Sequence, residues 1–558
     1  MSGKELNLAA QNEANMKIIA GNIVDVLSRR IYSGELVIEE GKIKQINEKP
    51  VEGGNYILPG FTDAHVHIES SMLVPSEFAR MAVVHGTICT VSDPHEIANV
   101  LGVKGVEFMV ENGSRVPFRF VFGAPSCVPA TPFETSGAEL NAATIEHLFD
   151  TLNLRYLSEM MNFPGVINAQ PDVMAKLSAA RRRGLPIDGH APGLKDKALR
   201  SYISAGISTD HECENLKEAL EKAALGMHIL IREGSAARNF DELLPLLKIH
   251  PQKVMFCSDD LHPDHLAEGH INRLVSRAIK QGYDLFDVLA ACTLNPTQHY
   301  STGAGLLQPG DPADFIVTAE LRDFDIIQTW INGILVAEKG KTLIEPVSVD
   351  TPNTFNAGKV RANDLQLVSA GGRMRVIEIY DGQLYTGAID IEAPPVGSAF
   401  QPDPSRDLAL LAVVNRYQPA KPALCPVKGS HLKAGALASS VAHDSHNIIA
   451  LGSSPEELAR AINLVIESKG GLAWVNDNRE EVLPLPVAGL MSANDGYLTA
   501  QTYQKMNRLA QNLTPGLSAP FMTLSFLALP VIPRLKLTDK GLFFVDDFQY
   551  VDNFFINI

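Results

Sequence analysis

The sequence is poor in cysteine and in positive charge. Only 6 of its 558 residues are cysteine. No two of them form a Cys-x-x-Cys pair, so they indicate reduced, mostly buried thiols of a cytoplasmic protein. Lys and Arg together number 48 against 64 Asp and Glu, which gives a net charge of −16. This balance argues against sequence-independent binding of nucleic acid, which requires a positive surface.

Long apolar segments are also missing. The sequence has no run of about 18 apolar residues, the length that a transmembrane helix requires. Residues 1–13 are polar and lack the apolar core of a signal peptide. We therefore expect a cytoplasmic protein with neither a membrane nor a nucleic acid as partner. With 45% hydrophobic and 20% charged residues, the chain has the composition of a globular protein.

The two flanks of the first 350 residues are rich in β-prone runs. Such runs, broken by turn residues, occupy residues 17–46 and return in residues 313–337. We predict that residues 1–56 and 305–350 together build one composite β-domain, a β-sandwich.

The segment between these flanks has a regular rhythm. Eight β-prone runs alternate with helical patterns, and their starts lie 20 to 37 residues apart. The runs begin near Ile57, Ile88, Arg119, Tyr156, Pro186, Gly206, His228 and Val254. This alternation is typical of an α/β fold, either a (β/α)8 TIM-type barrel or a doubly wound sheet. Polar residues end most of the runs, which favours a metal-dependent barrel over residues 57–304.

The last part of the chain has a different character. Pro-rich stretches interrupt strand patterns, and residues 454–467 form an amphipathic helical pattern. Ser454 and Glu457 have the spacing of a capping box. We predict a separate C-terminal α+β domain over residues 351–558.

Metal-binding residue types end several of the barrel runs. His65 and His67 have the i, i+2 spacing that places two strand residues on one face. Four later runs end in further suitable side chains. The full candidate set is His65, His67, Glu159, His190, His211 and Asp259. Four imidazoles and two carboxylates exceed the needs of one tetrahedral ion, so we expect two divalent ions, with Glu159 bridging them. These ligands suit Mn²⁺, Fe²⁺ or Zn²⁺.

This ligand order resembles the amidohydrolase superfamily, in which His-x-His follows the first strand, His follows strands five and six, and Asp follows strand eight. Many binuclear relatives bridge their metals with a carboxylated Lys from strand four, where this chain has Glu159. Longer stretches are similar to the adenine deaminase family; they are residues 63–73, 91–100, 158–166, 231–238 and 441–447. The resemblance implies hydrolysis of adenine to hypoxanthine and ammonia, in purine salvage, with Mn²⁺ or Fe²⁺ preferred. We also expect a homo-oligomer, most simply a dimer.

Two residues receive catalytic roles under this hypothesis. Asp259 can take the proton of the attacking water and pass it to the leaving amino group. Glu96, in protonated form, can face ring N1; alternatively it only starts the next helix, where a carboxylate interacts well with the helix dipole.

Four further residues are candidates for substrate contact: Ser126, His95, Asp260 and Arg232. A structural role for Arg232, in an ion pair with Glu233, is the alternative that we favour slightly. In the last domain His431, His443 and His446 attract notice, but the sequence assigns them no role.

Three alternatives stay open. A different amidohydrolase that cleaves a cyclic amide would be expected to bridge its metals with Lys, and residues 154–163 contain none. A non-catalytic relative that serves in assembly usually lacks metal ligands. A deaminase of another purine or of a nucleoside would differ only in pocket features that sequence does not display.

Overall fold

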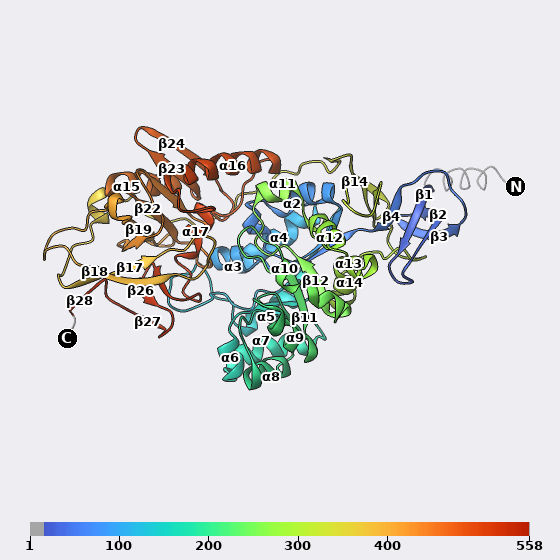
Figure 1. Ribbon diagram of the computed structural model, residues 1–558, viewed down its shortest axis with the longest axis horizontal. Coiled ribbons are helices and arrows are strands. Elements are labelled where there is room, and N and C mark those ends of the chain that lie inside the picture. The colour runs from blue at the N-terminus through green and yellow to red at the C-terminus, as the bar shows by residue number, and fades with distance from the viewer. Residues whose placement is uncertain (1–15, 557–558) are drawn as a thin grey trace.

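The computed structural model describes residues 16–556. The polar segment 1–13, which we predicted to lack a signal-peptide core, lies outside the described residues. Figure 1 shows an elongated molecule with the N-terminal strands at one end, a mixed helical and stranded centre, and the C-terminal third at the other end.

Eight short parallel strands form a ring in the centre. Each pairs with the next along the chain through ladder pairing, an isolated bridge or a backbone hydrogen bond, and β12 returns to β5 through the Val66–Asp259 bridge. The strands are β5 (Phe61–Val66), β6 (Thr87–Ser92), β7 (Arg119–Phe122), β8 (Leu157–Met160), β9 (Ile187–Gly189), β10 (Thr209–Asp210), β11 (His228–Arg232) and β12 (Val254–Cys257).

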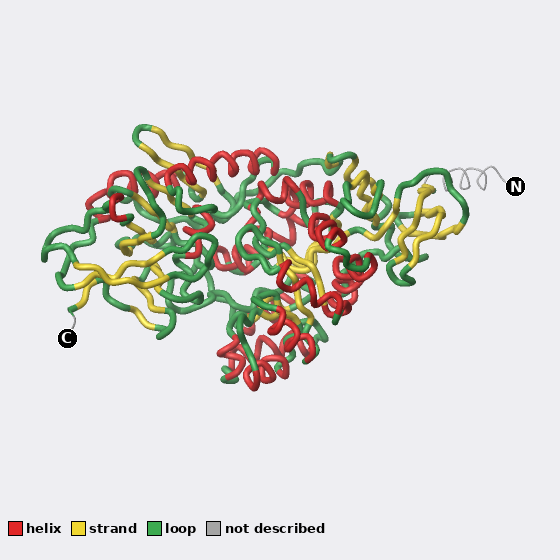
Figure 2. The backbone as a smooth tube through the Cα atoms, in the orientation of Figure 1, coloured by secondary structure: helices red, strands yellow, loops and turns green. Residues whose placement is uncertain are grey.

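Helices connect these strands, because parallel neighbours need a crossover on the outside of the sheet. The main connecting helices are α2 (Pro75–Ala82), α3 (His95–Leu101), α4 (Val103–Ser114), α5 (Ala142–Leu152), α7 (Pro171–Arg182), α8 (Asp196–Ser204) and α9 (Leu216–Ala224). Three more follow the last ring strand: α12 (Ile271–Lys280), α13 (Leu285–Cys292) and α14 (Leu294–Tyr300). Figure 2 shows helices packed around the central strands. Every residue of β5, β6 and β12 is buried, as expected for strands covered on both faces. The predicted α/β architecture is confirmed.

The two flanks of the ring share one eight-stranded sheet. Its strand order is β16-β15-β14-β13-β4-β1-β2-β3, so the two halves meet where β13 pairs with β4. The strands are β1 (Lys17–Asp25), β2 (Arg30–Glu39), β3 (Lys42–Glu48), β4 (Tyr56–Pro59), β13 (Phe315–Thr318), β14 (Ile326–Ile331), β15 (Ile334–Glu338) and β16 (Lys341–Thr342). Residues from both halves, among them Ile23 and Phe315, form a separate hydrophobic core.

The run that the sequence suggests as the first barrel strand is divided between the two sheets. Its start, β4, lies in the outer sheet, and the ring begins at Phe61. Gly60 stands at the division, and a Cβ there would come within 2.6 Å of Ile88 side-chain carbons. A larger residue at position 60 would therefore push the chain there away from Ile88 of β6.

The C-terminal third contains a nine-stranded sheet. It comprises β17 (Arg373–Glu378), β18 (Gly387–Glu392), β19 (Ala409–Val414), β20 (Ala423–Lys428), β21 (Ala436–Ser439), β22 (Ile448–Gly452), β23 (Gly471–Asn476), β24 (Arg479–Pro484) and β28 (Phe554–Phe555). Helix α15 (Pro455–Glu467) packs against it, and Ser454 caps this helix by accepting from the Glu457 amide at 3.2 Å.

This third packs against segments that follow the ring strands. The Ser492 amide donates to the Met72 carbonyl at 2.8 Å, and the Tyr503 hydroxyl lies 2.6 Å from His262 Nδ1. Tyr503 belongs to α16 (Gly496–Leu513), and Met72 and His262 follow β5 and β12 respectively. The C-terminal third thus covers the face of the ring on which the strands end.

Two compositional expectations can be checked against the described residues. All six cysteines are buried and none is paired in a disulfide. Within residues 16–556 no helix has both the length and the apolar character needed to cross a bilayer.

Candidate metal centre and active site

The side chains at the ends of the ring strands converge on one buried point. His65 Nε2 and His67 Nε2 lie 3.2 Å apart, and they are 3.8 and 3.3 Å from Asp259 Oδ1. Two ligand atoms of a tetrahedral ion, each about 2.0–2.2 Å from it, are separated by roughly 3.4 Å. The spacing of these three atoms therefore fits one divalent ion.

Glu159 lies between this group and a second pair of imidazoles. Its Oε1 is 3.5 Å from His67 Nε2, while its Oε2 is 2.8 Å from His190 Nδ1 and 3.1 Å from His211 Nε2. Each carboxylate oxygen thus faces a different set of imidazoles. The six side chains predicted from the sequence as ligands come together, and Glu159 lies between the two groups of imidazoles.

The closure of the ring positions these ligands. The Asp259 amide donates to the His65 carbonyl at 2.9 Å, and the His67 amide donates to the Asp259 carbonyl at 3.3 Å. Asp259 adopts a left-handed backbone conformation, with φ of 56°, which is uncommon outside glycine and is frequent at functional sites. Behind it, Asp63 accepts from the Ser258 amide at 3.0 Å and faces His270 Nε2 at 2.9 Å.

The electrostatics of the cluster favour the ligand forms of the two carboxylates and of His65. Burial alone would raise the pKa of Glu159, but His190 and His211 hold it well below its usual range. Burial likewise opposes ionisation of Asp259, yet Arg232 and His67 keep its pKa well below the ordinary value. Burial, helped by His211 and His67, lowers the pKa of His65. Ionised carboxylates and a neutral imidazole are the forms that bind metal.

For His67, His190 and His211 the facing carboxylates Asp259, Glu159 and Glu212 outweigh burial and raise the pKa, so each of these imidazoles must lose a proton to bind a metal.

The end of β6 contributes more to this centre than the sequence indicated. His95 Nδ1 lies 3.1 Å from Asp93 Oδ2 and 3.5 Å from Glu159 Oε1. With His67, these side chains form a further group whose ligand atoms lie within 4.8 Å of one another. His95, a predicted substrate contact, is therefore also adjacent to the candidate metal ligands.

Glu96 meets two histidines of the C-terminal third. Its Oε1 hydrogen-bonds His443 Nδ1, and its Oε2 lies 2.5 Å from His446 Nε2. Burial would raise the pKa of Glu96, but His443, His446 and His95 outweigh it and hold this pKa well below its usual range. These imidazoles therefore favour an ionised Glu96, while its role at ring N1 in the protonated form, expected from sequence, stays a prediction. The capping role falls instead to Glu69, whose Oε1 accepts from the Ile97 amide at 3.1 Å.

The other residues predicted to contact the substrate also lie at this centre, and each makes a hydrogen bond or an ion pair with another residue. Ser126 Oγ donates to the Glu159 carbonyl at 2.6 Å, and Asp260 Oδ1 accepts from Ser70 at 2.5 Å. Arg232 Nη1 lies 2.6 Å from Asp259 Oδ2 and also pairs with Glu212.

The ion pair suggested between Arg232 and Glu233 does not form, because Glu233 instead pairs with Arg277 at 2.6 Å. Glu212, which sequence reasoning missed, directly follows His211. His431 lies apart from the centre, with its side chain 59% exposed.

Comparisons with known proteins show which family the chain resembles. The model of the amidohydrolase family matches residues 56–336, and the model of the adenine deaminase C-terminal domain matches residues 383–549. "Adenine deaminase" of Salinibacter ruber is 52% identical over 538 residues, which cover 96% of this chain and 98% of that protein. "Adenine deaminase" of Methanosarcina mazei is 49% identical over 552 residues, which cover 97% of this chain and 100% of that protein. The solved β-aspartyl dipeptidase of Fervidobacterium islandicum matches 59% of this chain and 97% of its own, with 14% identity and a TM-score of 0.45.

Replacing Glu159 with Gln should weaken metal binding by more than about tenfold, because a neutral amide has lost the charge and one of the two equivalent oxygens. Metal content after dialysis at limiting metal, measured by elemental analysis, checks this. Glu146→Gln, at a half-exposed carboxylate of α5 that pairs with Arg182, is the matched control. Unchanged metal content in Glu159→Gln would remove the bridging role.

Proposed function

This chain belongs to the amidohydrolase family and, within it, to the adenine deaminases; from this premise we propose that it hydrolyses adenine to hypoxanthine and ammonia. The observation that carries the proposal is the likeness to adenine deaminases over nearly the whole chain, 52% over 96% of its length in one case. The buried donor set adds independent support, since it offers the ligands that metal-dependent hydrolysis needs.

The metal centre consists, in our proposal, of two divalent ions held by His65, His67, Glu159, His190, His211 and Asp259. Mn²⁺ or Fe²⁺ is the proposed metal, with Zn²⁺ as the alternative. Such a pair, when bound, polarises the substrate and activates a water molecule as nucleophile at neutral pH.

Asp259 is the proposed proton carrier of the reaction. Its carboxylate lies at the end of β12, next to His65 and His67, where the attacking water must be deprotonated. The same carboxylate then passes the proton to the leaving amino group. Arg232, at 2.6 Å from Oδ2, fixes the orientation of the carboxylate and leaves Oδ1 directed at the histidines.

Glu96 is proposed to act on the purine ring. Attack at C6 places electron density on N1, which must receive a proton or a hydrogen bond. Glu96 has an imidazole at each oxygen. Glu96 outweighs burial and raises the pKa of His443 to about 9, whereas burial lowers the pKa of His446, so His443 is the proposed local source of a proton. This role differs from the sequence-based expectation in that the proton would reside on His443 before the reaction.

The remaining roles are proposals of the same kind. Ser126, His95, Asp260 and Arg232 would line the substrate position, and Ser126 also supports the end of β8. We propose a homo-oligomer, most simply a dimer, that acts in purine salvage in the cytoplasm with no nucleic-acid or membrane partner.

The direct test is ammonia release from adenine by the purified chain reconstituted with Mn²⁺, Fe²⁺ or Zn²⁺. Adenosine, cytosine and dihydroorotate serve as comparison substrates. We expect turnover of adenine with at least one metal and little on the others. Absence of ammonia from adenine with all three metals would contradict the proposed function.

Asp259→Asn should retain bound metal through its amide oxygen but lose turnover by about 10²–10⁴-fold, because an amide cannot shuttle the proton. Steady-state kinetics and metal analysis of the same preparation check this. Asp264→Asn, a partly buried carboxylate in α11 (Pro263–Glu268), is the control. Wild-type turnover in Asp259→Asn would overturn the mechanism.

Glu96→Gln should keep its metals and reduce kcat by about 10²-fold, since a neutral amide neither attracts nor transfers the ring proton. The control is Glu107→Gln, at an exposed position on α4. Normal kinetics in Glu96→Gln would restrict Glu96 to a structural role in the first turn of α3.

A further inference from the structure

Glu212 is a largely buried carboxylate that pairs with Arg232 through both of its oxygens. Its Oε2 lies 2.9 Å from Arg232 Nη2, and its Oε1 pairs with Nη1. The side chains of Glu212 and Arg232 are only 15% and 12% exposed. A planar guanidinium that meets a carboxylate through two parallel N–H bonds is fixed in orientation as well as in place. Glu212 therefore sets the plane of the Arg232 guanidinium.

The same guanidinium holds Asp259, the proposed proton carrier. Arg232 Nη1 lies 2.6 Å from Asp259 Oδ2, so one nitrogen serves both carboxylates. The remaining nitrogen, Nε, is buried and has no hydrogen-bond partner within residues 16–556. The orientation of the guanidinium therefore depends on its pairing with Glu212 and Asp259.

Asn239 anchors the backbone on both sides of this ion pair. Its Oδ1 accepts from the Arg232 amide at 2.8 Å, and its Nδ2 donates to the carbonyls of His211 and Cys213 at 3.1 Å each. These two carbonyls belong to the residues on either side of Glu212. The buried Asn239 side chain thus ties the backbone around Glu212 to that of Arg232, so that the two charged groups face each other from fixed positions.

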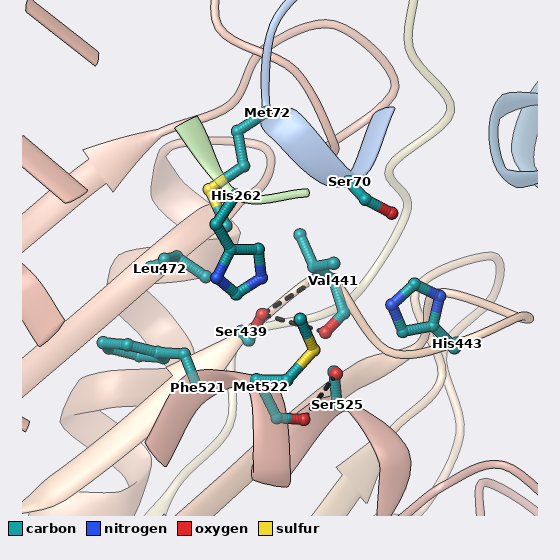
Figure 3. Close-up of a pocket in the computed structure, with 10 residues that line it drawn as sticks. All are labelled: Ser70, Met72, His262, Ser439, Val441, His443, Leu472, Phe521, Met522 and Ser525. Carbon is teal, nitrogen blue, oxygen red and sulfur yellow. Dashed lines mark hydrogen bonds between the residues drawn. The ribbon is translucent and has the colours of Figure 1, made fainter. Parts of the chain in front are cut away.

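The next carboxylate at the end of β12 is held differently. Asp260 Oδ1 accepts from the Ser70 hydroxyl at 2.5 Å. Figure 3 shows Ser70 beside a cavity that is lined from both the ring side and the C-terminal third. Its volume of about 10 Å³ holds roughly one water molecule. A hydroxyl next to such a cavity restrains a carboxylate less than a guanidinium that is itself held by a bidentate ion pair, so Asp259 is the more firmly oriented of the two.

We propose that Glu212 is a positioning residue for proton transfer by Asp259 and that it acts through Arg232. This inference rests on the proposed function. Without the charge of Glu212, the guanidinium is free to turn and meet both oxygens of Asp259, because bidentate pairing is the arrangement that the two groups favour. Asp259 Oδ1 would then be drawn away from the histidines, where the attacking water must be deprotonated. Glu212 thus keeps Oδ1 available for the proton.

A role as metal ligand is the competing explanation for Glu212. Its Oε1 lies 3.4 Å from His211 Nε2 and 3.7 Å from His190 Nδ1, and these three side chains could hold an ion. The positioning role is favoured because both oxygens of Glu212 are already paired with Arg232. An ion at Oε1 would have to displace Nη1 from it. The metal content of Glu212→Gln separates the two explanations.

The test measures kcat and KM for adenine, together with metal content, in the metal-loaded full chain carrying Glu212→Gln. We expect kcat to fall by about 10–100-fold, the cost of a misplaced catalytic group, and KM to change by less than about threefold. Metal content should stay at the wild-type value. Arg232→Lys should give the same pattern, because an ammonium keeps the charge but cannot hold two carboxylates in a fixed plane.

A double variant tests whether Glu212 acts through Arg232. In an Arg232→Met chain, adding Glu212→Gln should change kcat by less than about threefold, because the group that transmits the effect is already absent. The matched control is Glu214→Gln, at an exposed carboxylate two residues further along the chain, and it should retain the wild-type kcat.

Wild-type kcat in either Glu212→Gln or Arg232→Lys would overturn the inference. Loss of bound metal in Glu212→Gln would make Glu212 a metal ligand, and losses that multiply in the double variant would separate its effect from Arg232; both results would also overturn it. A wild-type chain that releases no ammonia from adenine contradicts the proposed function itself. Turnover of adenine with unchanged kcat in these variants contradicts only the role of Glu212.

Discussion

Closure of the strand ring between β5 and β12 is the constraint on which the rest of the site depends. His65 and His67 end the first ring strand and Asp259 follows the last, so these side chains meet only because the two strands are neighbours. The contact is secured by backbone hydrogen bonds of 2.9 and 3.3 Å between Asp259 and the two histidines. Asp63 adds a buried bond of 3.0 Å to the Ser258 amide. An open sheet would separate the first and last strands and divide the ligand set.

The closed ring also creates an electrostatic problem, because it buries many ionisable groups together. An isolated buried charge is strongly unfavourable, and pairing is what makes it tolerable. Outside the centre the structure solves this with direct ion pairs: Lys222 is fully buried between Asp210 and Glu218, at 2.7 Å from each. Within the centre, imidazoles and carboxylates face one another in the same way. Several of these distances also suit a shared cation, so charge compensation and metal binding use the same side chains.

Local sequence patterns were sufficient to predict the ring strands and the side chains that gather where these strands end, while their role as metal ligands stays a prediction. The His65-x-His67 spacing follows from strand geometry, and the order of Glu159, His190, His211 and Asp259 follows from one polar residue at each strand end. The division of residues 56–66 into two strands was missed, because the run is apolar on both sides of Gly60. The contact between Glu96 and His443 was missed for another reason: it spans 347 residues. No periodicity or spacing in a single sequence reports a contact across such a separation.

The two parts of the molecule contribute different chemistry to one site. Every candidate metal ligand comes from the ring, whereas His443, Asp444 and His446 come from the C-terminal third and reach the centre only through Glu96 and His95. A change among these three residues can therefore alter how a substrate is held without removing a metal ligand. Both oxygens of Glu96 are occupied by the imidazoles of His443 and His446, so Glu96 is placed to exchange a proton with them.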